Sequence, residues 1–301
     1  MKEIQTTRIG LPTGVTLKVA FGGPEEAEPI VFLHGFPESH RTWRHQLHNL
    51  ARDFHVFAPD QRGFAGSDKP EGVEEYETGK AVEDLFALAD AFGIGRFTLV
   101  GHDWGGAAAW AAALKHGERI RRLVIVNAPH PMIFQRSVIE DEAQRAASQY
   151  IRAFRTPGME AAIKAMGLRN FLEKSFSPHV DLRLISQAER DAYVEDWSRP
   201  GALTAMLNWY RAARIEVPEM DEKVRLPLWT HVPFPKVKMP VLVVWGLKDK
   251  ALLPMQLEGL GDYVEDLRIV VEKDAGHFIP WEKPEVVTSA IRDFIAETPL
   301  D

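Results

Sequence analysis

Thr98-Leu-Val-Gly-His-Asp-Trp-Gly-Gly106 joins an apolar stretch to an Ala-rich stretch of helical character. Its spacing is G-x-D-x-G, which places Asp103 where a sharp strand-to-helix turn most often carries a serine nucleophile. Glycines on either side leave room for such a turn, because they have no side chain to clash with the neighbouring backbone. The segment therefore predicts a nucleophile presented above the end of a strand.

An aspartate at this position changes the reaction that the turn can support. A carboxyl group has an ordinary pKa of about 3.9, so Asp103 needs no base to become ionised at neutral pH. A carboxylate is a weak nucleophile toward an acyl carbon, but it can displace a leaving group from a saturated carbon and form an enzyme ester. Asp103 thus favours epoxides and alkyl halides over lipids and peptides as substrates.

Segments of strand and helix character alternate through most of the chain. Apolar runs typical of parallel strands covered on both faces lie at 29–33, 55–59, 97–100, 122–127, 240–245 and 267–271. Helical stretches are expected at 80–92, 104–116 and 284–296. Residues 6–11 and 16–21 are expected to form a hairpin at one edge. The alternation predicts the α/β class, with a mostly parallel, eight-stranded sheet and helices on both faces.

The stretch from about residue 130 to 235 interrupts this alternation. It contains no convincing strand run, and amphipathic helices are expected at 141–154, 158–166, 168–176, 187–197 and 202–213. Ser186 and Glu189 have the spacing of a capping box that opens the fourth of these helices. We therefore expect a helical cap at 130–235, inserted into a core domain formed by 1–129 and 236–301.

Three polar residues fall at the ends of expected strands, where the loops of an open α/β sheet converge. Asp103 is followed along the chain by Asp249, after a strand and a glycine turn, and by His277, after the last strand. Nucleophile, acid and histidine in this order predict a catalytic triad. Taken singly, Asp249 also fits ordinary turn chemistry and His277 a surface or core histidine, so the prediction depends on their combination.

Phe32-Leu-His-Gly-Phe-Pro37 follows the first central strand, where a loop with an oxyanion hole belongs. We expect the backbone N–H groups of Phe36 and Trp104 to face the oxyanion that forms when the enzyme ester is hydrolysed. His34 and Pro37 of the same loop are assigned to the pocket. The alternative for this stretch is a simple Gly-Pro turn.

The composition excludes several classes of function. The chain has 301 residues, 45% of them hydrophobic, and its net charge of −7 argues against nucleic acid or anionic membrane as a partner. It has no cysteine, which excludes disulfides, thiolate catalysis and zinc–thiolate sites. The N-terminus lacks the apolar core of a signal peptide, and no stretch approaches the roughly 18 apolar residues of a membrane span. We expect a cytoplasmic protein, either a monomer or a homodimer.

Together the motifs resemble the soluble epoxide hydrolases of the α/β-hydrolase fold. The matching stretches are His34-Gly-Phe-Pro-Glu-Ser39, Asp60-Gln-Arg-Gly-Phe-Ala-Gly-Ser67, Gly101-His-Asp-Trp-Gly-Gly106 and Leu207-Asn-Trp-Tyr-Arg211. The resemblance extends from about residue 5 to 297 and is firmest in the core domain. It implies an enzyme that converts a small-molecule epoxide and water to a diol and that requires no metal or organic cofactor.

The resemblance also assigns two tyrosines of the expected cap. In the resembled family, a tyrosine pair hydrogen-bonds the epoxide oxygen and supplies a proton as the ring opens, and the matching positions are Tyr150 and Tyr210. A phenol of pKa about 10 remains protonated at neutral pH and can donate. The alternative is that both are half-buried contacts on amphipathic helices. With this pair, the leaving group implied for Asp103 is an epoxide oxygen.

Two other functions remain open. Haloalkane dehalogenases share the aspartate, the histidine and the tryptophan beside the nucleophile, but their usual asparagine after His-Gly is replaced here by Phe36. Fluoroacetate dehalogenases typically carry arginine after the nucleophile, where Trp104 and Gly105 stand. The other function is that of a catalytically inactive ligand sensor or interaction protein, which has no need of nucleophile, base, acid and proton donors together.

Overall fold

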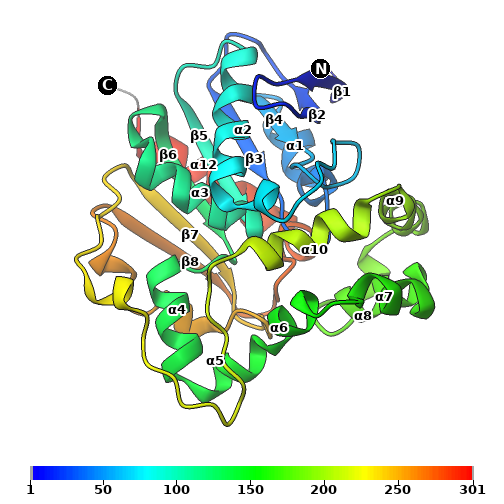
Figure 1. The fold of residues 1–301 in the computed structure, drawn as a ribbon. Helices are drawn as coiled ribbons and strands as arrows, with labels where there is room; N and C mark the ends of the chain where they lie inside the picture. Colours follow the sequence, from blue (N-terminus) through cyan, green and yellow to red (C-terminus); the bar gives the residue numbers. More distant parts are fainter. Residues whose placement is uncertain (1–2, 300–301) are drawn as a thin grey trace.

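An eight-stranded sheet forms the centre of the computed structural model, which describes residues 3–299 (Figure 1). Its strands are β1 Gln5–Gly10, β2 Thr16–Gly22, β3 Pro29–Leu33, β4 His55–Pro59, β5 Phe97–His102, β6 Ile120–Val126, β7 Val241–Gly246 and β8 Leu267–Glu272. They lie in the order β1-β2-β4-β3-β5-β6-β7-β8. β2 pairs antiparallel with β1 and β4, and all later neighbours are parallel. The predicted α/β class and edge hairpin are confirmed.

Helices cover both faces of the sheet. They are α1 Arg44–Leu50, α2 Thr78–Ala91, α3 Trp104–Lys115, α11 Ile279–Glu282 and α12 Pro284–Glu297. Successive strand residues point to opposite faces, so Val31 joins the apolar cluster that includes α2 and α3, whereas Ile30 and Phe32 join the one that includes α1 and α12. This double burial explains why the central strands β3 to β7 are largely apolar. The sequence pattern did not predict α1, whose seven residues include only two apolar side chains.

A helical insertion separates β6 from β7. Its helices are α4 Pro131–Glu140, α5 Glu142–Ala147, α6 Gln149–Arg155, α7 Met159–Met166, α8 Leu168–Phe176, α9 Gln187–Ser198 and α10 Ala202–Ala212. No strand occurs between β6 and β7 in the described chain, as expected for a cap. The capping box of Ser186 and Glu189 at the start of α9 is confirmed. The division into a core of 1–129 and 236–301 and a cap of 130–235 stays a prediction.

The structure corrects the start of this insertion. The single helix expected at 141–154 is two helices, α5 and α6, separated at Ser148. The hydroxyl of Ser148 accepts a hydrogen bond from the Gln144 side chain at 3.0 Å, and its N–H is shared between two carbonyls one turn back. This local bonding tightens the chain and offsets α6 from α5. In addition, Pro131 opens the unpredicted helix α4, because proline suits the first turn of a helix.

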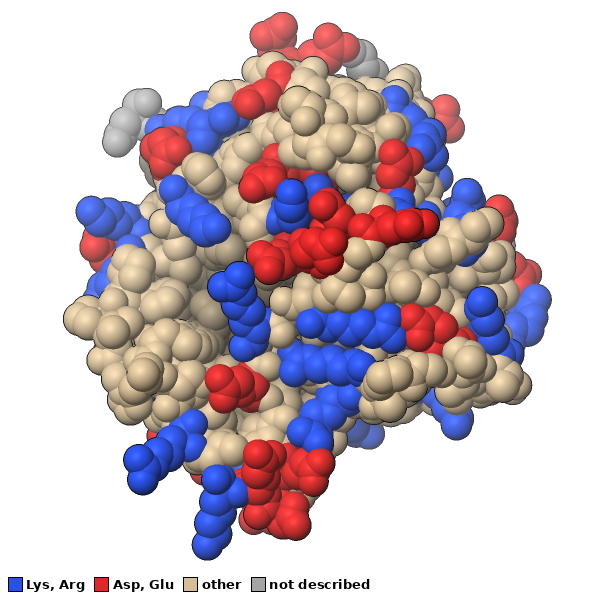
Figure 2. Space-filling model, in the orientation of Figure 1, with Lys and Arg blue, Asp and Glu red and all other residues tan. Residues whose placement is uncertain are grey.

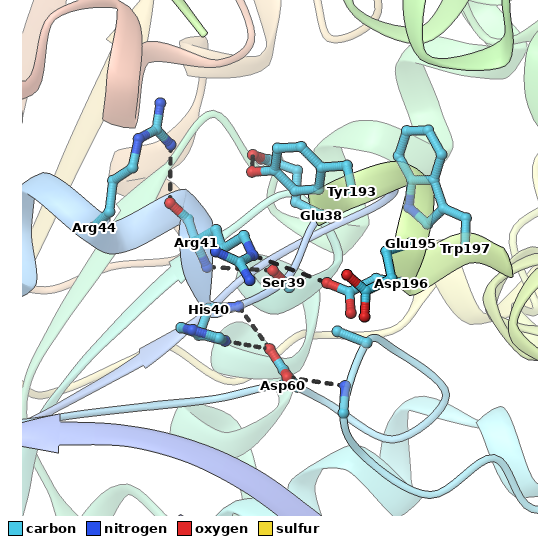
Figure 3. Close-up of polar contacts among 12 residues, drawn as sticks. Glu38, Ser39, His40, Arg41, Arg44, Asp60, Tyr193, Glu195, Asp196 and Trp197 are labelled. Atoms are coloured by element: carbon cyan, nitrogen blue, oxygen red, sulfur yellow. Dashed lines mark hydrogen bonds and ion pairs between the residues drawn. The ribbon is translucent and has the colours of Figure 1, made fainter. Parts of the chain in front are cut away.

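The insertion rests on the loop that follows β3. From α9, the indole N–H of Trp197 donates to the Pro37 carbonyl at 2.7 Å, and the Tyr193 hydroxyl donates to Glu38 at 2.9 Å. Figure 3 shows Tyr193 beside Glu38 in this contact. These contacts hold the cap against the segment that begins with Phe36.

Both described ends of the chain lie in the upper part of Figure 1, on the opposite side of the sheet from α5 to α8. None of the helices within residues 3–299 combines the length and the apolar character needed to cross a bilayer. Acidic and basic side chains are interspersed over the face drawn in Figure 2.

Candidate active site

Asp103 occupies a strained turn between β5 and α3. Its φ of 50° and ψ of −121° lie outside the regions that side chains usually allow. A side chain at Gly105 would lie 2.2 Å from the Leu33 carbonyl oxygen, and one at Gly101 would lie 2.5 Å from that of Gly105. The glycines of the motif are therefore required for the close packing that holds Asp103 above the strand.

Each oxygen of the Asp103 carboxylate has a different neighbour. The Phe36 N–H donates to Oδ1 at 2.8 Å, while the Nε2 atom of His277 lies 3.6 Å from Oδ2. The first contact requires glycine at the preceding position, because a Cβ on Gly35 would lie 2.2 Å from Oδ1. One oxygen is thus held by the backbone, and the other is available for reaction.

His277 is oriented by the second acid. Its Nδ1 atom lies 2.7 Å from Oδ2 of Asp249, whose other oxygen accepts the N–H groups of Ala251 and Leu252, each at 2.9 Å. These fixed donors hold the Asp249 carboxylate in place. The structure therefore brings the three predicted residues of the triad together.

Asn127 completes the support of the acid, and sequence reasoning did not assign it a role. Its side-chain amide donates to Asp249 Oδ2 at 2.8 Å and accepts the Gly246 N–H at 2.8 Å, so it ties the end of β6 to the end of β7. Asn127 has a positive φ of 39°, which asparagine tolerates better than most residues. An asparagine directly after a buried strand is the only sequence signal that could have indicated it.

The charges of the triad stabilise one another. Burial alone would lower the pKa of His277, but Asp249 and Asp103 overcome this effect and raise it well above 6.5. Burial alone would raise the pKa values of Asp103 and Asp249, but the bonds and charge of His277 bring both below the ordinary value. The free site therefore holds an imidazolium between two carboxylates.

The two predicted tyrosines face Asp103 from the cap. Tyr150 lies in the first turn of α6 and Tyr210 near the end of α10, with ring centroids 6.0 Å apart and edge to face. Burial raises the pKa of both phenols well above 10, and the charge of Asp103 adds to the effect. Both phenols therefore stay protonated across the physiological range. Tyr210 also packs against Phe36 and Trp104, with ring centroids 5.0 and 5.1 Å away.

These groups share a cavity of about 440 Å³. The groups expected to be reactive, Asp103, His277, Tyr150 and Tyr210, all line it. Its apolar wall consists of Phe36, Pro37, Ala147, Phe154, Met159, Ile163, Met166, Phe171, Ala251 and Phe278, and the remaining lining residues are Lys174, Ser175, Pro178, His179 and Lys250. Pro37, assigned to the pocket from the sequence, is among the residues that line this cavity. The wall contributed by α7 and α8 was not predicted, because it depends on how the cap helices pack.

His34 does not line this cavity. Its ring is fully buried below the loop, where Nε2 accepts the Gln61 N–H at 3.0 Å and Nδ1 therefore donates to the Gly35 carbonyl at 2.9 Å. Burial lowers its pKa to about 4, so the ring is neutral. His34 shapes the oxyanion loop rather than the pocket surface. Trp104 is the first residue of α3, so its N–H is among the unpaired donors at that helix start.

A buried acid, Glu38, also lies behind the site. It accepts hydrogen bonds from Tyr193 at 2.9 Å and from Trp281 at 3.0 Å, and its other oxygen is 3.9 Å from Nδ1 of His102. Burial raises its pKa to about 7. His102 in turn donates from Nε2 to the His277 carbonyl at 2.8 Å, because a carbonyl can only accept. The sequence placed Glu38 in the motif at 34–39 but predicted no role for it.

Comparison with known proteins identifies the family. Residues 28–284 match the α/β-hydrolase fold family. A solved structure of novel epoxide hydrolases from metagenomes of hot environments is 46% identical, with a TM-score of 0.90, and the match covers 97% of this chain and 98% of that one. This chain belongs to the epoxide hydrolases of the α/β-hydrolase fold. Its predicted family is confirmed.

Two further relatives place the chain in the same family. Epoxide hydrolase 3 of Xenopus tropicalis is 32% identical, over 95% of this chain and 76% of the relative. A mutant epoxide hydrolase from Bacillus megaterium, solved with its naphthyloxy-propanediol product, is 31% identical, with a TM-score of 0.84 over 96% of this chain and 99% of the other.

Proposed function

We propose that this protein hydrolyses an epoxide to a vicinal diol through an ester on Asp103. The observation that carries the proposal is the pair of protonated phenols, Tyr150 and Tyr210, lining the same cavity as an ionised aspartate. A carboxylate supplies the nucleophile, and the phenols supply the donors that an epoxide oxygen needs as the ring opens. The diol bound to the Bacillus megaterium relative supports a product of this class.

In the first step, Oδ2 of Asp103 attacks an epoxide carbon and the carbon–oxygen bond of the ring breaks. The departing oxygen takes a proton from the tyrosine pair, which leaves a hydroxyalkyl ester on the enzyme and a tyrosinate. Oδ2 is the attacking atom because Oδ1 is already held by the Phe36 N–H. Removing a donor of this kind typically costs roughly 10²–10³ in rate.

The second step requires His277 as a base. Once Asp103 is an ester, it no longer carries the negative charge that helps to raise the pKa of His277, so the imidazolium can give its proton to the tyrosinate and then accept one from water. Water attacks the ester carbonyl carbon, and the N–H groups of Phe36 and Trp104 stabilise the oxyanion at Oδ1. The tetrahedral intermediate then collapses and expels the diol, whose departing oxygen takes the proton from His277. The proton of the new carboxyl group then returns to His277, which restores the imidazolium between the two carboxylates.

Trapping the ester tests this proposal. His277→Gln keeps a polar side chain of similar size but removes the base, so we expect turnover to fall by about 10²–10⁴ while the ester accumulates. Mass spectrometry after exposure to styrene oxide should show a gain equal to the whole mass of the epoxide. Asp103→Asn is the control that should form no adduct. Full activity of His277→Gln without an adduct would disprove the assignment.

Dehalogenation is distinguished by its products. The same carboxylate and histidine could act on an alkyl halide, but the donors facing Asp103 are hydroxyl groups. We expect diol from styrene oxide and no halide release from chloroalkanes or fluoroacetate. Chloride or fluoride release at a rate comparable with diol formation would favour a dehalogenase instead.

A further inference from the structure

The wall of the cavity changes from apolar to basic toward solvent. Among the residues that line it, only Lys174, Pro178 and Lys250 are exposed. The other lining residues are apolar, apart from Ser175, His179 and the reactive groups themselves. The opening of the cavity is therefore marked by two ammonium groups.

The two lysines reach the opening from different parts of the fold. On α8, Phe171, Lys174 and Ser175 have i, i+3 and i+4 spacing and share one helix face, which lines the cavity. Lys250 comes from the core, directly after Asp249, in the turn fixed by the N–H groups bound to that carboxylate. The backbone positions of both lysines are therefore set by regular structure or by hydrogen bonds.

Neither ammonium group is neutralised within residues 3–299. No carboxylate there pairs with Lys174 or Lys250, whereas the neighbouring Lys248 pairs with Asp274 at 3.0 Å. The only acidic side chain that lines the cavity is Asp103, which already faces His277. The opening is thus locally positive in a protein of net charge −7, whose overall field repels anions.

We propose that Lys174 and Lys250 bind the anionic end of the substrate, so that the preferred substrate is an epoxide on an apolar chain that ends in a carboxylate. This inference rests on the proposed epoxide hydrolysis and specifies its substrate class. The epoxide lies between Asp103 and the tyrosines, the chain contacts Ile163 and Phe171, and the carboxylate meets the lysines. Two flexible ammonium groups, without an arginine fork or a cluster of backbone N–H groups, suit a singly charged carboxylate better than a phosphate.

Paired substrates test the inference by steady-state kinetics. The substrates are epoxides at the far end of heptanoate, nonanoate and undecanoate chains, each compared with its uncharged methyl ester. We expect the wild-type kcat/KM ratio of acid to ester to exceed one and to peak at one chain length, because the backbone positions of both lysines are set relative to Asp103. In Lys174→Met/Lys250→Met, the ratio should fall about tenfold.

Lys164→Met is the matched control, because Lys164 is an exposed cap lysine that does not line the cavity. Its acid-to-ester ratio should equal that of the wild type. Added salt should lower kcat/KM for the acids and not for the esters, and this difference should shrink in the double variant. A wild-type ratio of one or less, or a ratio that the double variant leaves unchanged, overturns the inference.

A binding measurement separates this inference from the proposed reaction. Nonanoate has no epoxide and cannot react, so titration calorimetry with it reports the anion contact without any turnover. An uncharged ester of nonanoate is the comparison ligand. Tighter binding of nonanoate that weakens about tenfold in the double variant supports the lysine site even if no epoxide is hydrolysed. Equal binding of both ligands contradicts it even if epoxides are hydrolysed.

Discussion

At the scale of single residues, the chemistry depends on what surrounds each ionisable group. Asp103 and His277 hold opposite charges because they face each other, whereas burial keeps Tyr150 and Tyr210 protonated. The cavity thus holds a nucleophile and proton donors in the required states at the same pH. In the proposed mechanism, esterification of Asp103 removes one negative charge and allows His277 to act as a base.

Tyr210→Phe tests the separation of the two steps. The variant keeps the ring that packs on Phe36 and Trp104 but loses the hydroxyl, so ester formation should slow by roughly 10²–10³. Hydrolysis of the ester depends on His277 and should slow much less. Rapid-quench single-turnover kinetics measure both rates. Equal slowing of the two steps would show that Tyr210 acts on the shape of the site rather than on the leaving oxygen.

At the scale of secondary-structure elements, the sequence predicted most reliably the buried strands and the polar residues that follow them. The buried strands were recognisable because both of their faces are apolar, and Asp103, Asp249 and His277 were found because each follows a strand. Helices α1 and α4 were missed, since α1 is short and Pro131 resembled a loop. Asn127 and the wall formed by α7 and α8 could not be inferred, because their roles depend on packing between segments distant in sequence.

Helix α9 of the helical insertion is bonded through Trp197 to the loop that follows β3. Trp197→Phe keeps a smaller aromatic ring but leaves the Pro37 carbonyl unpaired in a buried setting, which typically costs about 1–3 kcal/mol. We expect a lower urea midpoint and a lower kcat, because the loop carries the Phe36 N–H. Trp229→Phe, at an exposed tryptophan, is the control. Unchanged stability and kcat in the Trp197 variant would exclude this coupling.

At the scale of the whole molecule, the cost of burying Glu38 makes stability depend on pH. The unfolded carboxyl ionises above its ordinary pKa of 4.5, whereas the folded one stays protonated to about 7. The stability gained by burying the neutral acid is therefore full below pH 4.5 and is lost as the pH rises through about 7. The loss across this interval amounts to roughly 3 kcal/mol.

Glu38→Gln should remove this dependence. Glutamine keeps an oxygen that can accept from Tyr193 and Trp281, and it has no proton to lose. We expect the stability difference between the variant and the wild type to move in favour of the variant as the pH rises from about 5 to 8. Urea unfolding at both pH values measures this difference. Glu71→Gln, at an exposed acid, should follow the wild-type curve. Parallel curves for Glu38→Gln and the wild type would contradict the prediction.

The position of the chain ends has a practical consequence. Strand β1 begins and helix α12 ends in the upper part of Figure 1, away from α5 to α8. A solid support or a fusion partner attached before β1 or after α12 is therefore far from α5 to α8. In a packed-bed reactor, anchoring through either end keeps the support away from helices α6 to α8, which line the cavity.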